Sequence, residues 1–176
     1  MIRAPLFSRP AFDTFAAMFL SLAIAAPALA SGTIPTHHLS AQLANRAVAA
    51  AVADCAARGY SESAVVVDTS GVDQAELRGD GAGIHTPESA YDKAYTSVSL
   101  GIDTQVLDDT QRSQIAPDGP FSKVPHLVLF GGGVVVKLGT ETIAAIGAAG
   151  APGGKLDDAC AHAGLDAIRD VLSQSP

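Results

Sequence analysis

The sequence predicts an α+β fold in which helices flank an antiparallel sheet. Apolar residues spaced four apart near both ends of the chain predict helices, and short runs of β-branched residues between them predict strands. The expected order is helix, two strands, helix, three strands, helix. A parallel sheet would need a crossover helix after nearly every strand, so these consecutive strands favour antiparallel pairing.

The first expected elements are a helix and a hairpin. Ser40 can cap a helix that carries Ala47, Ala51 and Cys55 on one stripe, and Gly59 can end it. Two β segments follow at residues 64–68 and 72–78, and turn-forming residues separate them. This spacing predicts a β-hairpin.

A second helix is expected to begin at Thr86, with Thr86 as its N-cap and Pro87 in its first position. Residues 103–124 are polar, with a weak helical turn over 104–114, and we expect this segment to be mobile. Three β segments then follow at 126–130, 133–138 and 140–151. A last helix is expected over about 156–172.

The N-terminal 30 residues resemble a secretory signal, with Arg3 and Arg9 before an apolar run and Ala28-Leu29-Ala30 at its end. The alternative is an uncleaved membrane anchor, but the apolar run is shorter than the roughly 20 residues that span a bilayer. We expect residues 1–30 to be removed, 31–39 to be a disordered lead and 40–176 to form one domain. The mature protein would then be periplasmic or secreted, without a membrane span.

The composition excludes several classes of function. The formal net charge is −7 and the basic residues are scattered, which argues against a nucleic-acid partner. The sequence contains no GxSxG motif, so it gives no indication of a serine hydrolase. Cys55 and Cys160 belong to no Cys-x-x-Cys pair, so a zinc site is unsupported, and either a bond between them or two buried thiols remains.

The stretch "LRGDGAG", residues 77–83, lies between an expected strand and an expected helix. It is not a dinucleotide fingerprint, because Ile84 occupies the place of the third glycine and Asp80 would repel a pyrophosphate. One interpretation is a turn that needs positive φ at its glycines. The other is that Gly81 and Gly83 let a flat ligand lie against the backbone.

Polar residues near this loop are candidates for binding. His85 could reach a metal or a porphyrin iron, although a single loop histidine is commonly just solvated. Lys93 and Thr96 share the helix face opposite the apolar stripe. They are either solvated or directed at an anionic ligand.

Five motifs together resemble the GlcG/HbpS family of haem-binding proteins. They are "VVVDTSG", "LRGDGAG", "SAYDKAYT", "LFGGGVVV" and "AAIGAAGAPGGKLDDACAHAGLDAI", and the resemblance spans about residues 41–168. The stretch "GGGVVV" departs from the family, which often has a proline there.

The resemblance implies a profilin-like fold with a five-stranded antiparallel sheet, assembled into a homo-oligomer. It implies haem as the cofactor, with cobalamin, bound by a related domain of PduO proteins, as a less favoured one. His85 or Thr96 would lie near the iron, with His85 as the metal ligand. Arg78 and Lys93 would hold the propionates.

In a profilin-like arrangement the first and last helices share one face of the sheet. Cys55 and Cys160 lie on their apolar stripes and could form a disulfide there. Two buried free thiols are the alternative.

We therefore expect a periplasmic or secreted haem-binding protein, with a role in haem or iron capture, haem breakdown or redox sensing, rather than a conventional enzyme. One alternative is a protein or enzyme that binds a small 2-hydroxy or 2-oxo acid such as glycolate. Another is a sensor subunit that contacts a membrane kinase.

Overall fold

The computed structural model describes residues 32–111 and 123–174. The expected signal sequence, and half of the polar segment expected to be mobile, residues 112–122, lie outside these residues. The helices and strands of these described ranges belong to one compact unit, residues 35–176.

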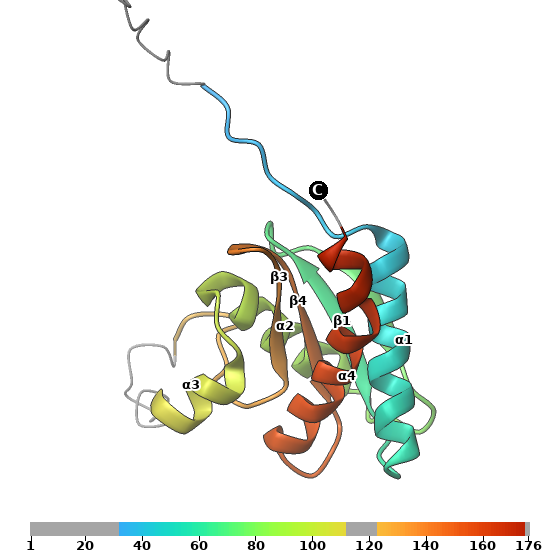
Figure 1. The fold of residues 1–176 in the computed structure, drawn as a ribbon. Helices are drawn as coiled ribbons and strands as arrows, with labels where there is room; N and C mark the ends of the chain where they lie inside the picture. Colours follow the sequence, from blue (N-terminus) through green and yellow to red (C-terminus); the bar gives the residue numbers. More distant parts are fainter. Residues whose placement is uncertain (1–31, 112–122, 175–176) are drawn as a thin grey trace, which may run out of the picture. The chain divides into compact units, whose positions relative to one another are not determined.

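This unit has three layers (Figure 1). One face of the sheet carries the first and last helices, and the other face carries the second helix. The elements are α1 (Ala41–Ala57), β1 (Ser63–Asp68), β2 (Asp73–Arg78), α2 (Thr86–Leu100), α3 (Thr104–Gln111), β3 (Gly133–Leu138), β4 (Glu141–Ala149) and α4 (Gly154–Ser173).

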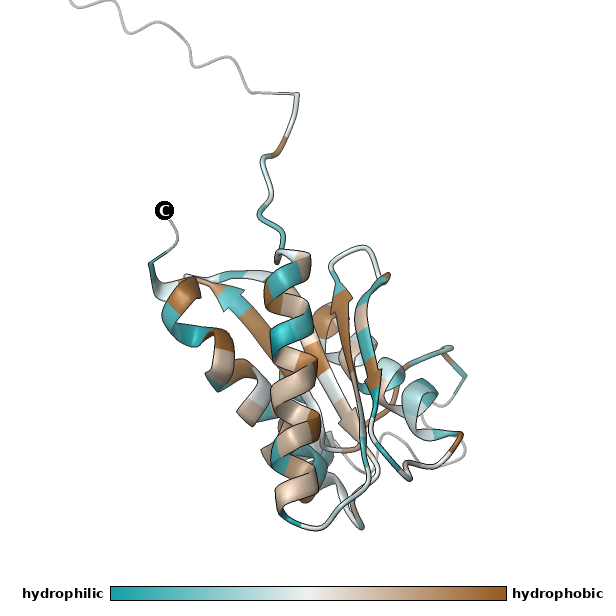
Figure 2. Cartoon of the chain, turned by 90° about the vertical axis from the view of Figure 1, so that its right-hand side faces the viewer, coloured by the Kyte–Doolittle hydropathy of each residue, from teal (hydrophilic) through white to brown (hydrophobic). Residues whose placement is uncertain are grey.

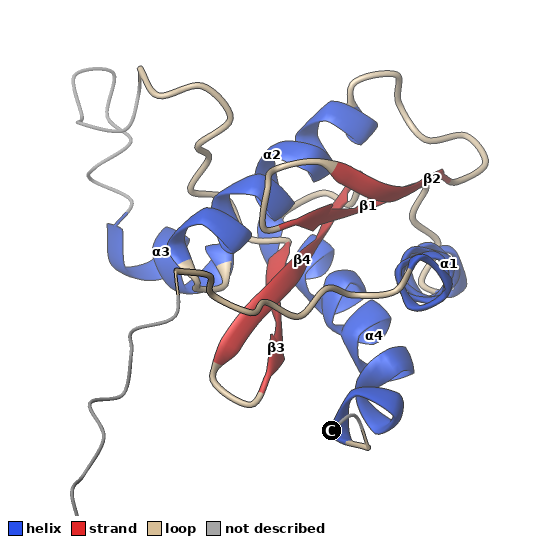
Figure 3. Ribbon diagram, turned by 90° about the horizontal axis from the view of Figure 1, so that it is seen from above, coloured by secondary structure: helices blue, strands red, loops and turns tan. Residues whose placement is uncertain are grey.

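The sheet is antiparallel with the order β2-β1-β4-β3, as seen from above in Figure 3. The α+β class and the hairpin are confirmed. Its central ladder joins the two halves of the chain, because Ser63 pairs with Ala149 and Asp68 with Ala144. Among the described residues the sheet has four strands, so the predicted five-stranded sheet is wrong.

The missing strand is the segment 126–130, which is a loop in the structure. The outer edge of β3, where a fifth strand would pair, already has hydrogen-bond acceptors. The Asp103 carboxylate accepts from the Val135 N–H at 2.8 Å, and the Thr104 hydroxyl oxygen accepts from the Gly133 N–H at 2.8 Å. Side chains before and at the start of α3 therefore cap the edge that a strand would otherwise cover.

The core between the sheet, α1 and α4 is built from small and β-branched side chains, and the apolar strands are evident in Figure 2. Cys55 of α1 and Cys160 of α4 are fully buried in it. Their Cα atoms lie 5.5 Å apart and the two residues form a disulfide. The bond joins the two helices of this layer across 105 residues of sequence.

On the other face, α2 approaches the sheet unusually closely. A Cβ at Gly147 of β4 would clash with the backbone carbonyl of Ala90 in α2. The residues packed around this contact are also small, with Ala94 and Ala145 fully buried. Glycine and alanine on both surfaces therefore set the short distance between α2 and β4.

The helix starts agree with the sequence in one case and differ in another. The Ser40 hydroxyl accepts a hydrogen bond from the Leu43 N–H at 3.3 Å, which confirms the predicted cap of α1. His85, not Thr86, is the N-cap of α2. Thr86 instead turns inward, where its hydroxyl lies 2.7 Å from that of Ser63 and 2.8 Å from the Gly83 carbonyl.

The end of the expected disordered lead is attached to the domain. Leu39 is buried, and the Gln74 side-chain amide donates to its carbonyl. His37 contacts Glu141 of β4 through its backbone N–H at 3.0 Å and its ring Nδ1 at 2.7 Å. Residues 37–39 thus pack as part of the folded unit.

Candidate functional site

Two partly buried tyrosines of α2 and a histidine of the loop before β3 form an aromatic cluster. Tyr91 and Tyr95 are one helical turn apart, with ring centroids separated by 5.8 Å. The ring of His126, from the loop before β3, lies 5.3 Å from Tyr91 and 5.5 Å from Tyr95. We call these three residues the tyrosine–histidine face.

His126 is held in a defined orientation. Its Nδ1 lies 2.8 Å from the Asp92 carboxylate, and its side chain is 47% exposed. Because Nδ1 contacts Asp92, the other ring nitrogen, Nε2, is available to bind a ligand. Histidines that bind metals are commonly oriented in this way, with the second nitrogen donating to a carboxylate.

The backbone at His126 is strained. Its φ of 63° is the only positive φ of a non-glycine residue in the described ranges. Such conformations cost free energy and persist where surrounding contacts enforce them, often at functional sites. The contacts here come from α2 and fix both the ring and the loop.

Thr96 holds the loop in place beneath this face. It is fully buried, and its hydroxyl oxygen accepts from the Val128 N–H at 2.9 Å. The same oxygen lies 3.0 Å from the carbonyl of His126 and 2.8 Å from that of Asp92, so its single proton serves one of them at a time. Thr96 therefore positions the histidine loop, rather than facing a ligand itself.

The turn between β1 and β2 supports the tyrosines. The Tyr91 hydroxyl donates to the Gly71 carbonyl at 2.9 Å, and a Cβ at Gly71 would press on the Tyr95 ring. Burial raises the pKa of Tyr91, with smaller effects from neighbouring groups such as the Asp73 carboxylate. The phenol stays neutral, so Tyr91 offers its ring rather than a charge.

The structure does not bring the predicted site residues together at one place. His85 is exposed at the start of α2, and eleven residues of helix put it about 16 Å from Thr96. The Arg78 guanidinium donates to the Ala82 carbonyl, which closes the glycine loop on itself. Gly81 has a φ of 77°, as the turn interpretation expects.

Lys93 does not face outward as expected. It is 5% exposed, and its ammonium group donates to the Asp157 carboxylate at 2.5 Å and to the Ala148 carbonyl at 3.0 Å. Burial raises the pKa of Asp157, and the Lys93 ammonium opposes that rise. The buried Lys93 side chain thus links α2 to β4 and α4.

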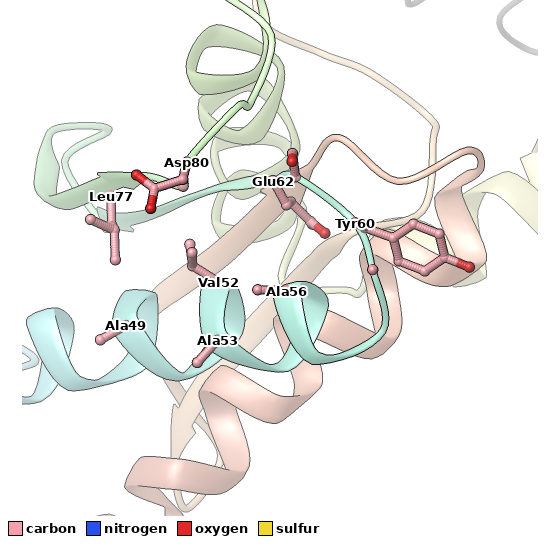
Figure 4. Close-up of a pocket in the computed structure, with 11 residues that line it drawn as sticks. Ala49, Val52, Ala53, Ala56, Tyr60, Glu62, Leu77 and Asp80 are labelled. Carbon is pink, nitrogen blue, oxygen red and sulfur yellow. The ribbon is translucent and has the colours of Figure 1, made fainter.

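The glycine loop borders a cavity of about 520 Å³, shown in Figure 4. Its floor consists of apolar residues of α1, and Gly79 and Asp80 form one rim. Glu62, which precedes β1, also lines it. The Asp80 carboxylate on its rim, with no cationic side chain in the lining, makes this cavity unsuited to an anionic ligand.

Sequence reasoning missed the tyrosine–histidine face. Tyr91 and Tyr95 at a four-residue spacing were a usable signal for a shared helix face. No sequence signal indicated the contact between Asp92 and His126, because 34 residues separate them. The apolar run that includes His126 predicts a strand, whereas the structure has a loop there.

Comparisons with known proteins identify the family. The chain matches the family model described as "Haem degrading protein HbpS-like" over residues 39–166. The chain belongs to the HbpS-like family. This confirms the resemblance to the GlcG/HbpS proteins.

Solved structures resemble this HbpS-like chain closely. A crystal structure of HbpS is 35% identical, with a TM-score of 0.71, and the match covers 78% of this chain and 94% of that one. A double mutant of Streptomyces reticuli HbpS is also 35% identical, with a TM-score of 0.70 and coverages of 82% and 97%. A PduOC:heme complex is 26% identical, with a TM-score of 0.68 and coverages of 75% and 96%. The comparison with curated proteins found no match.

The tyrosine–histidine face carries side chains of types that can contact haem. Imidazole is a common axial ligand of haem iron, and aromatic rings pack well against a flat macrocycle. Phe130, four residues after His126, is an exposed apolar residue of the same loop. Lys123, three residues before His126, is exposed. Among the described residues, no helix is long and apolar enough to cross a bilayer.

Proposed function

We propose that this HbpS-like protein binds haem on the tyrosine–histidine face, with His126 as the iron ligand. The observation that carries the proposal is the Nδ1 contact of His126 with Asp92, which leaves Nε2 for a metal. Haem bound there would supply the redox chemistry of its iron. Tyr91 and Tyr95 would pack against the macrocycle.

The sequence had favoured His85 or Thr96 near the iron. His126 is the better candidate because its ring is fixed by a carboxylate and flanked by two aromatic rings. Thr96 supports the same loop from below, whereas Lys93 is committed to Asp157 and Arg78 to Ala82. Lys123 replaces them as our candidate for a propionate.

The proposed face is open, because the His126 side chain is about half exposed. One subunit would therefore cover only one side of a haem. A second copy of the chain covering the other side fits the homo-oligomer that the family resemblance implies. Periplasmic or secreted localisation, and a role in capture, breakdown or redox sensing, remain part of this proposal.

The 2-hydroxy acid alternative has weaker support. A carboxylate ligand needs a free cationic partner, and both cations suggested for it have protein partners in the structure. The cavity near the glycine loop carries the Asp80 carboxylate instead. A sensor subunit that contacts a membrane kinase stays a prediction.

Titration of the folded protein with hemin tests the proposal. Wild type should bind and shift the Soret band, and His126→Ala should bind at least about tenfold more weakly with an altered spectrum. His85→Ala is the matched control and should behave as wild type. Failure of wild type to bind hemin would refute the function, whereas unchanged binding by His126→Ala would refute the site.

A further inference from the structure

Glu62 is a buried carboxyl group that the proposed haem site does not use. The residue is 1% exposed, and its Oε1 has no hydrogen-bond partner among the described residues. Burial is the main reason that the pKa of Glu62 rises to about 8, and the neighbouring Asp157 carboxylate adds to the rise. A buried polar atom without a partner costs free energy, so the position of Glu62 needs a reason.

The other carboxyl oxygen of Glu62 points at the disulfide. Its Oε2 contacts the Sγ atom of Cys55, which is bonded to Cys160. The two sulfurs and one carboxylate oxygen all lie within 4.8 Å of one another. All three side chains are buried, so protein groups rather than bulk solvent surround this cluster.

We propose that Cys55, Cys160 and Glu62 form a binding site for a thiophilic divalent metal of the zinc class when the disulfide is reduced. Thiolate sulfur and carboxylate oxygen are both zinc ligands, and two sulfurs favour zinc over magnesium or calcium. Three protein ligands leave one position of a tetrahedral ion for water. In this state the Glu62 carboxyl group faces a cation in place of an uncharged disulfide.

The reductant in this proposal is a small dithiol. It transfers two electrons and two protons to the Cys55–Cys160 bond, which breaks into two thiols while the dithiol becomes a disulfide. The metal then displaces three protons, one from each thiol and one from the Glu62 carboxyl group. The resulting complex carries one negative charge, and the ammonium group of Lys93 acts on Glu62 in the compensating direction.

The cavity beside the glycine loop gives small species a route toward the cluster. Tyr60, Ser61 and Glu62 line it where α1 ends, and Figure 4 shows Glu62 above the last turn of that helix. A metal ion or a small dithiol is far smaller than the cavity. A protein reductant would need the surrounding helices to open.

Metal binding by the full chain, oxidised and reduced, tests this site. Protein treated with dithiothreitol, and then freed of it under nitrogen, should bind one Co²⁺ with a thiolate-to-cobalt charge-transfer band that Zn²⁺ abolishes. Oxidised protein should show no such band. Glu62→Gln should bind at least about tenfold more weakly, whereas Glu76→Gln, an exposed glutamate on β2, should match wild type.

Two results would overturn the proposal: reduced protein that binds no more metal than oxidised protein, or Glu62→Gln that binds as tightly as wild type. Circular dichroism covers the case in which reduction unfolds the chain. Zn²⁺ should then restore the helical signal, and failure to restore it also refutes the site. If Glu62→Gln alters only the pH dependence of disulfide reduction, Glu62 is a proton donor to sulfur and the metal site is wrong. None of these outcomes depends on haem binding.

Discussion

Asp92 and Lys93 are consecutive residues of α2, and one side chain makes its contact near the surface while the other makes its contact in the interior. The Asp92 carboxylate lies 2.8 Å from Nδ1 of His126 at the surface, and the Lys93 ammonium lies 2.5 Å from the Asp157 carboxylate in the interior. A single turn of helix therefore orients the candidate iron ligand and ties its own backbone to β4 and α4. The stability of the site depends on both contacts.

Replacing Lys93 by methionine should destabilise the fold, because it leaves Asp157 buried without its partner. We expect a loss of about 3–5 kcal/mol in the free energy of unfolding, measured by urea denaturation. The double variant Lys93→Met with Asp157→Leu should recover most of that loss. A single variant as stable as wild type would show that the ion pair contributes nothing.

Asp92→Asn should weaken haem binding without unfolding the protein. The amide cannot stabilise the imidazole as a carboxylate does, so we expect hemin affinity to fall about 10- to 100-fold. Circular dichroism should be unchanged, since Asp92 lies at the surface of α2. Wild-type affinity in this variant would separate Asp92 from the function of His126.

Glu62 should make the stability depend on pH. Its pKa is raised to about 8 in the folded state, so the folded protein retains a proton that the unfolded chain releases above about pH 4.5. The stabilisation by this proton is fully present below pH 4.5 and is lost as the pH rises toward 8. The loss is on the order of 1 kcal/mol per pH unit. Urea denaturation of Glu62→Gln with the disulfide intact should lack this component between pH 5 and 8, and an identical pH profile would contradict it.

Replacing both cysteines by alanine should lower stability through the unfolded state. The bond closes a loop across 105 residues, for which the chain-entropy model gives up to ~4.7 kcal/mol. Denaturant unfolding of the double variant Cys55→Ala, Cys160→Ala measures the loss. Mass spectrometry of unreduced wild type should show two hydrogens fewer than the dithiol form, and alkylation of both thiols without reduction would rule the bond out.

The sequence was sufficient to predict the local elements of the fold. The four-residue spacing placed α1 and α4, and turn residues placed the hairpin of β1 and β2. The prediction of a strand over 126–130 was wrong, because a short apolar run does not show which segment it would pair with. Only Leu129 of that run is buried, and Thr96 takes the backbone N–H of Val128.

The candidate site was less predictable because its contacts are distant in sequence. Lys93 looked solvent-facing from its place on the helix, yet it reaches Asp157, 64 residues further along. The same distance problem concealed His126, which finds Asp92 only when the loop folds over α2. Helical periodicity describes the faces of a single element, whereas each of these contacts joins residues from two different elements.

The pairing of β1 with β4 determines when the chain can fold during its synthesis. The hairpin of β1 and β2 emerges early, but the strand that flanks β1 on its other side ends at Ala149, and the helix that covers the same core ends at Ser173. A nascent chain that stops before these residues exposes one edge of β1 and the apolar stripe of α1. The domain can therefore complete this core only when the residues through Ser173 are available to pack against its first half.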